Sequence, residues 1–228
     1  MTLLTKNGKV YPDKHDIQSM LYSALGSSRY GENHDRPSFK YFTYSDFFYD
    51  KKERGTLVVS SPYPRLVDTI FEWAKNQDFI QLGSLSFEIQ KVQVIKPRLN
   101  NEFTSGSPIV LYLDSASGEY FSLREHGDIT FFLDRMKDNA LKKYEFFNGT
   151  ELHLEGPLFD AVELRREVAV PVRIRGYNLT FIGSLWKSLV KDDIEENADF
   201  YQFLMETGLG EKNSLGFGFI NPVGSGQS

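Results

Sequence analysis

In the first half of the chain, apolar positions alternate between strand-like and helix-like spacing. Leu3 and Leu4 indicate a short opening strand, and apolar residues then recur at helical spacing over residues 16–25, up to a stop signal at Gly26. The same reasoning predicts a second helix around residues 66–74 and strands over residues 40–44, 56–60 and 87–95. The first half therefore predicts short strands alternating with two amphipathic helices.

The second half repeats this alternation. Residues 96–108 are rich in Pro, Asn, Gly and Ser, which favours a linker. Beyond the linker, the pattern predicts a strand at 109–113, a long helix at 129–146, a hairpin of 161–164 with 168–174, a strand at 179–185, a helix at 199–205 and a last strand near 217–220. Strand–helix–strand–strand–helix–strand written twice predicts an α+β protein of two tandem ferredoxin-like (βαββαβ, RRM-like) domains, at residues 1–98 and 107–228.

Composition excludes several classes of protein. Hydrophobic residues make up 40% of the chain and aromatic residues 14%, which is enough for a packed core. There is no apolar run of membrane-spanning length, and the polar start is unlike a secretory signal, so we expect a cytoplasmic protein without a membrane partner. With 0 Cys, the chain has no disulfide, no thiolate nucleophile and no Cys-ligated zinc.

The net charge of -5 excludes a uniformly basic surface for nucleic acid but leaves room for a local basic patch. The candidates for such a patch are Arg165, Arg166, Arg173 and Arg175. Because Arg173 and Arg175 alternate with apolar neighbours, we expect both side chains on one face of a strand, where they could follow a phosphate backbone. The alternative is a solvated strand face balanced by Glu163 and Glu167.

Residues 208–219, GLGEKNSLGFGF, form a glycine-rich loop between the last helix and the last strand. The loop lacks both the P-loop ending and the dinucleotide fingerprint. Its glycines, Gly208, Gly210, Gly216 and Gly218, could let the backbone approach a ligand, and Lys212, Asn213 and Ser214 could bind phosphate. The alternative is a tight connection whose glycines only satisfy turn geometry.

Two segments carry a resemblance to a known family. GEKNSLGFG, residues 210–218, resembles the C-terminal signature of the CRISPR-associated endoribonucleases that cut precursor CRISPR RNA within its repeats, members of the RAMP superfamily of tandem ferredoxin-like domains. HDRPSFKYFTYS, residues 34–45, resembles the segment that holds the active-site histidine of that family. His34 and Lys40 match its histidine and lysine, and Tyr22 matches a tyrosine on the preceding helix.

The resemblance implies a metal-independent endoribonuclease that has no cofactor and binds repeat RNA. Such cleavage needs a base, an acid and positive charge on the transition state, and His34, Tyr22 and Lys40 could supply them. His15 is a second candidate for the acid–base role. The resemblance also allows a non-catalytic RNA-binding subunit of a CRISPR effector complex, and a tandem interaction module without RNA is a third possibility. The expected partners are precursor CRISPR RNA and an effector complex, with the protein as a monomer or homodimer.

Overall fold

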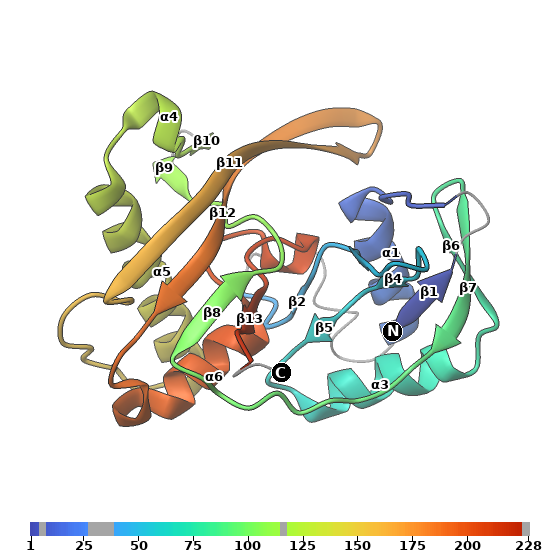
Figure 1. Cartoon of the computed structure of the whole chain (residues 1–228), viewed down its shortest axis with the longest axis horizontal. Coiled ribbons are helices and arrows are strands. Elements are labelled where there is room, and N and C mark those ends of the chain that lie inside the picture. The colour runs from blue at the N-terminus through green and yellow to red at the C-terminus, as the bar shows by residue number, and fades with distance from the viewer. Residues whose placement is uncertain (5–7, 27–38, 115–117, 225–228) are drawn as a thin grey trace.

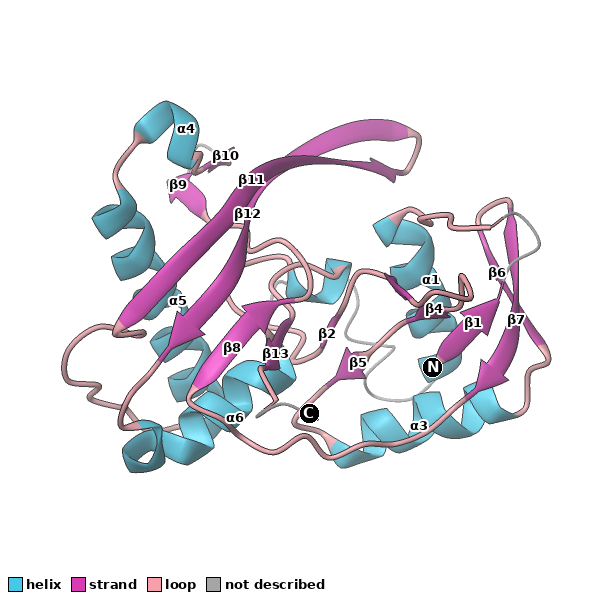
Figure 2. Cartoon of the chain, in the orientation of Figure 1, coloured by secondary structure: helices cyan, strands magenta, loops and turns pink. Residues whose placement is uncertain are grey.

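The structure is a computed structural model that describes residues 1–4, 8–26, 39–114 and 118–224. Figure 1 shows two halves lying side by side, each built of helices and strands. The N-terminal half is coloured blue to cyan-green and the C-terminal half green to red. Figure 2 shows that each half has its own sheet and its own helices. None of the helices in the described residues combines the length and the apolar composition that a membrane span requires.

The N-terminal half has a five-stranded antiparallel sheet in the order β3-β4-β1-β7-β6. Its elements are β1 (Thr2–Leu4), α1 (Lys14–Leu25), β3 (Phe48–Tyr49), β4 (Gly55–Thr56), α3 (Pro64–Lys75), β6 (Phe79–Leu82) and β7 (Leu85–Lys91). In a βαββαβ order, the four strands of this half are β1, β3, β4 and β7. The first strand, β1, lies between the third, β4, and the fourth, β7, and β6 is an additional strand at the edge of the sheet.

The C-terminal half has the same arrangement in a four-stranded sheet of order β11-β12-β8-β13. Its main elements are β8 (Glu102–Ser105), α5 (Ile129–Asn148), β11 (Ala161–Ile174), β12 (Tyr177–Val190), α6 (Ala198–Thr207) and β13 (Ile220–Pro222). Here too the first strand, β8, lies between the third and fourth, β12 and β13. Both halves therefore have the ferredoxin-like βαββαβ topology, and the predicted fold class is confirmed.

Smaller elements complete the chain. They are β2 (Thr43–Tyr44) paired with β5 (Val59–Ser60), β9 (Tyr112–Asp114) paired with β10 (Glu119–Tyr120), the short helix α4 (Leu123–His126), and the 3-10 turns η1 (Ile194–Asn197) and η2 (Asn213–Leu215). The η2 turn lies inside the glycine-rich loop.

Several predicted strands differ from the structure because tertiary pairing overrides local pattern. The strand predicted at 56–60 is split between β4 and β5, which pair in two different sheets, around the fully buried Leu57. The hairpin predicted within 161–174 is wrong: β11 is one strand of 14 residues, and its hairpin partner is β12. Its charged middle resembled a turn in the sequence, whereas in the structure it lies exposed on a strand at the edge of the sheet.

The predicted linker at 96–108 also contains a strand. β8 pairs with both β12 and β13 near the centre of the C-terminal sheet, although Asn and Gly flank it in the sequence. The predicted domain bounds, 1–98 and 107–228, leave this strand between them and stay a prediction.

Candidate active site

The glycine-rich loop leaves the end of α6 and closes on itself before β13. The Leu209 N–H donates to the carbonyl oxygen of Gly218 at 2.8 Å, and this bond closes the base of the loop. The Glu211 N–H donates to Val110 O, and the Gly218 N–H donates to Pro108 O, both at 2.8 Å. The loop is thereby hydrogen-bonded to the segment that follows β8.

Two of its glycines are required by close packing. Gly218 has φ +75°, and a Cβ there would lie 1.8 Å from the carbonyl oxygen of Leu209. Gly216 has φ +79°, and a Cβ there would lie 2.1 Å from the ring of Tyr44. No side chain fits at such distances, so at these two positions the structural interpretation of the glycines holds.

Only the middle of the loop is open to solvent. Gly208, Gly210, Gly216 and Gly218 are all buried, whereas Lys212 is exposed and Asn213 and Ser214 are half-buried. A ligand approaching the loop would first meet the three polar residues that the sequence singled out, and not the glycines.

A cavity of about 430 Å³ lies between this loop, α5 and the segment before β2. It is lined by Phe39, Lys40, Tyr41, Asn139, Lys143, Thr207, Gly210, Glu211, Lys212, Asn213 and Ser214. The fold thus brings Lys40, from the first half of the chain, to the same cavity as the polar stretch Lys212–Ser214. Cationic and polar groups converging on one cavity could bind an anionic ligand.

The other two predicted catalytic residues are placed differently. Tyr22 lies on α1, where its ring packs edge-on against Phe42 at 5.7 Å between centroids. Tyr22 is half-buried and is absent from the lining of the cavity. His34 lies outside the described residues.

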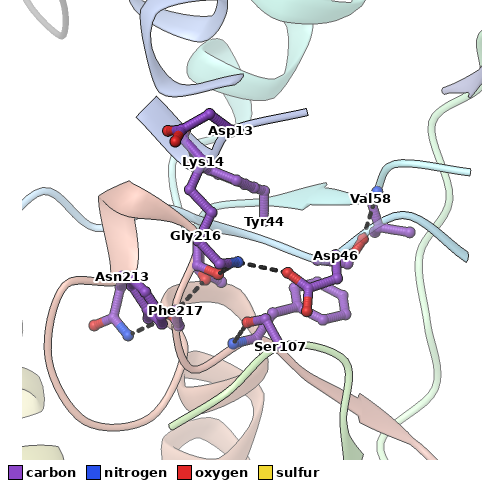
Figure 3. Close-up of polar contacts among 12 residues, drawn as sticks. Asp13, Lys14, Tyr44, Asp46, Val58, Ser107, Asn213, Gly216 and Phe217 are labelled. Atoms are coloured by element: carbon purple, nitrogen blue, oxygen red, sulfur yellow. Dashed lines mark hydrogen bonds and ion pairs between the residues drawn. The ribbon is translucent and has the colours of Figure 1, made fainter. Parts of the chain in front are cut away.

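Helix α1 docks directly on the loop through Lys14, a residue that the sequence analysis missed (Figure 3). The Lys14 ammonium donates to the carbonyl oxygen of Gly216 at 2.7 Å and to the Asp46 carboxylate at 2.5 Å. Burial lowers the pKa of Lys14, while Asp46 raises it. The Tyr44 hydroxyl donates to the backbone oxygen of Lys14 at 2.5 Å, and Gln18 Nε2 donates to Ser214 O at 3.0 Å.

A second buried lysine, also missed, holds the loop from the other side. Lys143 lies on the face of α5 that carries Phe132, Met136 and Ala140, and its side chain ends at the loop. Its signal in the sequence was a lysine at an apolar position of the helical repeat. Burial lowers the pKa of Lys143 to about 7, even though the nearby Glu211 carboxylate opposes this shift.

The four arginines are all exposed, but Arg173 and Arg175 do not share a strand face as predicted. β11 ends at Ile174, and Arg175, with φ +50°, forms the two-residue hairpin turn with Gly176. Such a turn needs positive φ at both positions, which takes Arg175 out of the strand alternation. The tip touches the N-terminal half, where the Arg173 N–H donates to Asp13 Oδ2 at 2.9 Å.

Arg165 and Arg166 lie further back along β11, at a shift in its register with β12. The carboxylates proposed to balance the arginines have other partners. Glu163 pairs with Lys187 at 2.9 Å, and Glu167 accepts from the Ser122 hydroxyl at 3.0 Å. Among the described residues, no cluster of three His, Asp or Glu side chains could hold a metal ion.

Comparisons with known proteins agree with this architecture. The family model described as "CRISPR associated protein Cas6, C-terminal" matches residues 90–222. A curated protein of Methanocaldococcus jannaschii, named CRISPR-associated endoribonuclease Cas6 2, is 40% identical over 222 residues, which cover 92% of each chain.

Solved structures show the same fold. A structure titled "Characterization of a Cas6-related gene from Pyrococcus furiosus" has a TM-score of 0.73 at 18% identity, covering 99% of both chains. One titled "An RAMP protein binding different RNA substrates" has a TM-score of 0.72 at 19% identity, covering 98% of both. The resemblance seen in the sequence is confirmed, and the chain belongs to the Cas6 family of CRISPR-associated endoribonucleases.

Proposed function

We propose that this protein binds CRISPR repeat RNA and cuts precursor CRISPR RNA once within the repeat, without a metal ion. The observation that carries the proposal is the cavity shared by Lys40 and the polar stretch Lys212–Ser214, in a chain of the Cas6 family. Repeat RNA is the expected partner, with transfer of the product to an effector complex and a monomer or homodimer as the working state.

In the proposed reaction, the ribose 2′-oxygen at the cut site attacks the adjacent phosphorus while the bond from phosphorus to the 5′-oxygen breaks. A base takes the proton of the 2′-hydroxyl, and an acid gives a proton to the leaving 5′-oxygen. The products are a 2′,3′-cyclic phosphate and a 5′-hydroxyl. The reaction as written consumes no water and uses no metal ion.

We assign the acid–base role to His34, on the resemblance described above. Lys40 would stabilise the negative charge that develops on the phosphoryl oxygens, and its place in the cavity wall supports this role. Tyr22 would orient the reacting groups or share a proton transfer. Its ring contact with Phe42, two residues after Lys40, supports a position close to this segment.

Charged and polar groups at the rim of the cavity and beyond it would hold the rest of the RNA. Lys212, Asn213 and Ser214 offer one ammonium and polar groups at the rim, and Arg173 and Arg175 form the exposed hairpin tip. Arg165 and Arg166 would extend the contact along β11. Because Lys212 and the four arginines are exposed, they can bind phosphate locally despite the acidic total.

The test is a cleavage assay in EDTA on repeat RNA from the CRISPR array of the host. It compares the wild type with His34→Ala and Lys40→Ala, and includes a substrate with a 2′-deoxy sugar at the cut site. His153→Ala is the matched control, because His153 is an exposed histidine that is not among the residues lining the cavity. We expect one cut that survives EDTA and is lost with His34→Ala and with the deoxy substrate.

Other outcomes would redirect the assignment. Tight binding without any cut would identify the non-catalytic RNA-binding subunit. A cut unaffected by His34→Ala would move the acid–base role, with His15 tested next, and a cut abolished by EDTA would contradict the metal-independent mechanism.

A further inference from the structure

The buried lysine on α5 has no part in the proposed chemistry, yet its hydrogen bonds go to the glycine-rich loop. The Lys143 ammonium donates to the carbonyl oxygens of Gly208 at 2.8 Å and Gly210 at 3.2 Å, and to Asn213 Oδ1 at 2.6 Å. An ammonium has three protons, so these three acceptors use all of them.

Asn213 extends this hydrogen bonding to the rest of the loop. While its Oδ1 accepts from Lys143, its Nδ2 donates to the carbonyl oxygens of Leu209 and Phe217, both at 3.0 Å. One lysine therefore fixes the outgoing part of the loop directly and the returning part through a single amide side chain. Figure 3 shows the Asn213 amide aimed at Phe217.

An ammonium is an unusual choice at this position. Only 2% of Lys143 is exposed, and the positions before it on the same face of α5 are Met136 and Ala140. Burying an ammonium costs free energy, which is offset here by its three acceptors in the loop. An apolar side chain would leave these acceptors unpaired, so the lysine couples the stability of this site to the shape of the loop.

We propose that Lys143 is a positioning residue that holds the glycine-rich loop, partly through the Asn213 amide, in the shape that presents Lys212 and Ser214 to RNA. Both Lys143 and this polar stretch line the same cavity as Lys40. The proposal rests on the proposed function for its RNA, but the preformed loop itself can be tested without RNA.

The test compares Lys143→Met, which keeps an unbranched side chain one atom shorter and removes the donors, with Lys142→Met as the matched control. Lys142 is the adjacent lysine on α5 and is exposed. The first readout is amide hydrogen exchange without RNA. We expect exchange over residues 208–213 to rise about tenfold in Lys143→Met, which is the scale of one charged hydrogen bond, with no change over β1 or in the control.

The second readout separates binding from chemistry. With the 2′-deoxy repeat RNA, the Kd of Lys143→Met should rise about tenfold, again on the scale of one charged hydrogen bond. The single-turnover rate at saturating RNA should stay within about twofold of the wild type, because the reacting groups are untouched. Lys142→Met should match the wild type in both.

Wild-type exchange together with a wild-type Kd in Lys143→Met would overturn the proposal. So would a large fall in the rate at saturating RNA with an unchanged Kd, which would place Lys143 in the chemistry. If Lys143→Met fails to fold, Asn213→Ala removes the acceptor from a half-buried position, and unchanged exchange and Kd there would overturn the proposal equally. If the wild type binds no repeat RNA, the proposed function fails while the exchange readout still decides the role of Lys143.

Discussion

The Lys14 ammonium lies 2.7 Å from the carbonyl oxygen of Gly216, although 202 positions separate the two residues in the chain. This hydrogen bond ties the first helix of one ferredoxin-like half to the glycine-rich loop of the other. The ammonium also lies 4.8 Å from the ring centroid of Phe217, so the loop meets the lysine through both a carbonyl and an aromatic face. Docking of the halves and the shape of the loop are therefore coupled.

Replacing Lys14 should weaken this docking. Lys14→Met leaves the Gly216 carbonyl without its ammonium partner, while Asp46, 43% exposed, can rehydrate. We expect a loss of about 1–3 kcal/mol in the free energy of unfolding, measured in urea. Lys9→Met, at an exposed lysine, is the control and should change the free energy by less than about 0.5 kcal/mol. Equal effects of the two substitutions would mean that the Lys14 hydrogen bond contributes nothing.

Gly218 should tolerate no side chain. Gly218→Ala combines φ +75° with a Cβ 1.8 Å from the Leu209 oxygen, whereas Gly149→Ala has φ +73° and no atom within 4 Å. The pair isolates the cost of the clash from the cost of positive φ. We expect about 1 kcal/mol for Gly149→Ala and at least about 3 kcal/mol for Gly218→Ala in thermal or urea unfolding. Similar losses would show that the backbone moves away without cost.

The arginines of the hairpin tip should contribute to RNA affinity by neutralising phosphates. Substituting Arg173 or Arg175 with Ala should reduce the slope of log Kd against log salt by about 0.7–0.9 for each phosphate that is no longer neutralised. Arg65→Ala, at an exposed arginine on α3, is the control. An unchanged slope in both tip variants would place the hairpin outside the RNA footprint.

Stability should depend on pH through Lys143. Burial lowers its pKa from 10.5 to about 7, so between these values the unfolded chain binds a proton that the folded chain does not. Over this range the folded Lys143 amine keeps two donors for its three acceptors in the loop. The free energy of unfolding of the wild type should therefore rise with pH from about 7 to 10.5, relative to Lys143→Met, with a slope approaching about 1.4 kcal/mol per unit. The charged groups that line the cavity with Lys143, namely Glu211, Lys212 and Lys40, are kept in both proteins.

Urea unfolding of the two proteins at matched pH values measures this difference. If the free energy of unfolding changes with pH in the same way for the wild type and Lys143→Met, the folded protein does not depress the pKa of Lys143. A stability of the wild type that falls with rising pH over this range, relative to the variant, would reverse the predicted sign.

Local periodicity in the sequence predicted the helices well. The helix predicted at 16–25 is α1 at 14–25, and the one predicted at 129–146 is α5 at 129–148, because helical spacing and capping residues act over a few positions. The same short-range signals predicted the βαββαβ fold class of both halves, but they placed β8 in a linker and divided β11 into a hairpin. The glycine-rich loop was also visible, because four glycines in so short a stretch are unusual.

Tertiary structure alone decided which segments meet. Residues 56–60 have the pattern of one strand, but pairing with β1 on one side and β2 on the other splits them. The sequence could place Lys40 and Lys212 only on separate segments, and the fold brings them to one cavity. The buried roles of Lys14 and Lys143 depend on carbonyl oxygens far away in the chain. Hydrogen bonds between distant segments leave no periodic trace, so the partners of these two lysines could be found only in the folded chain.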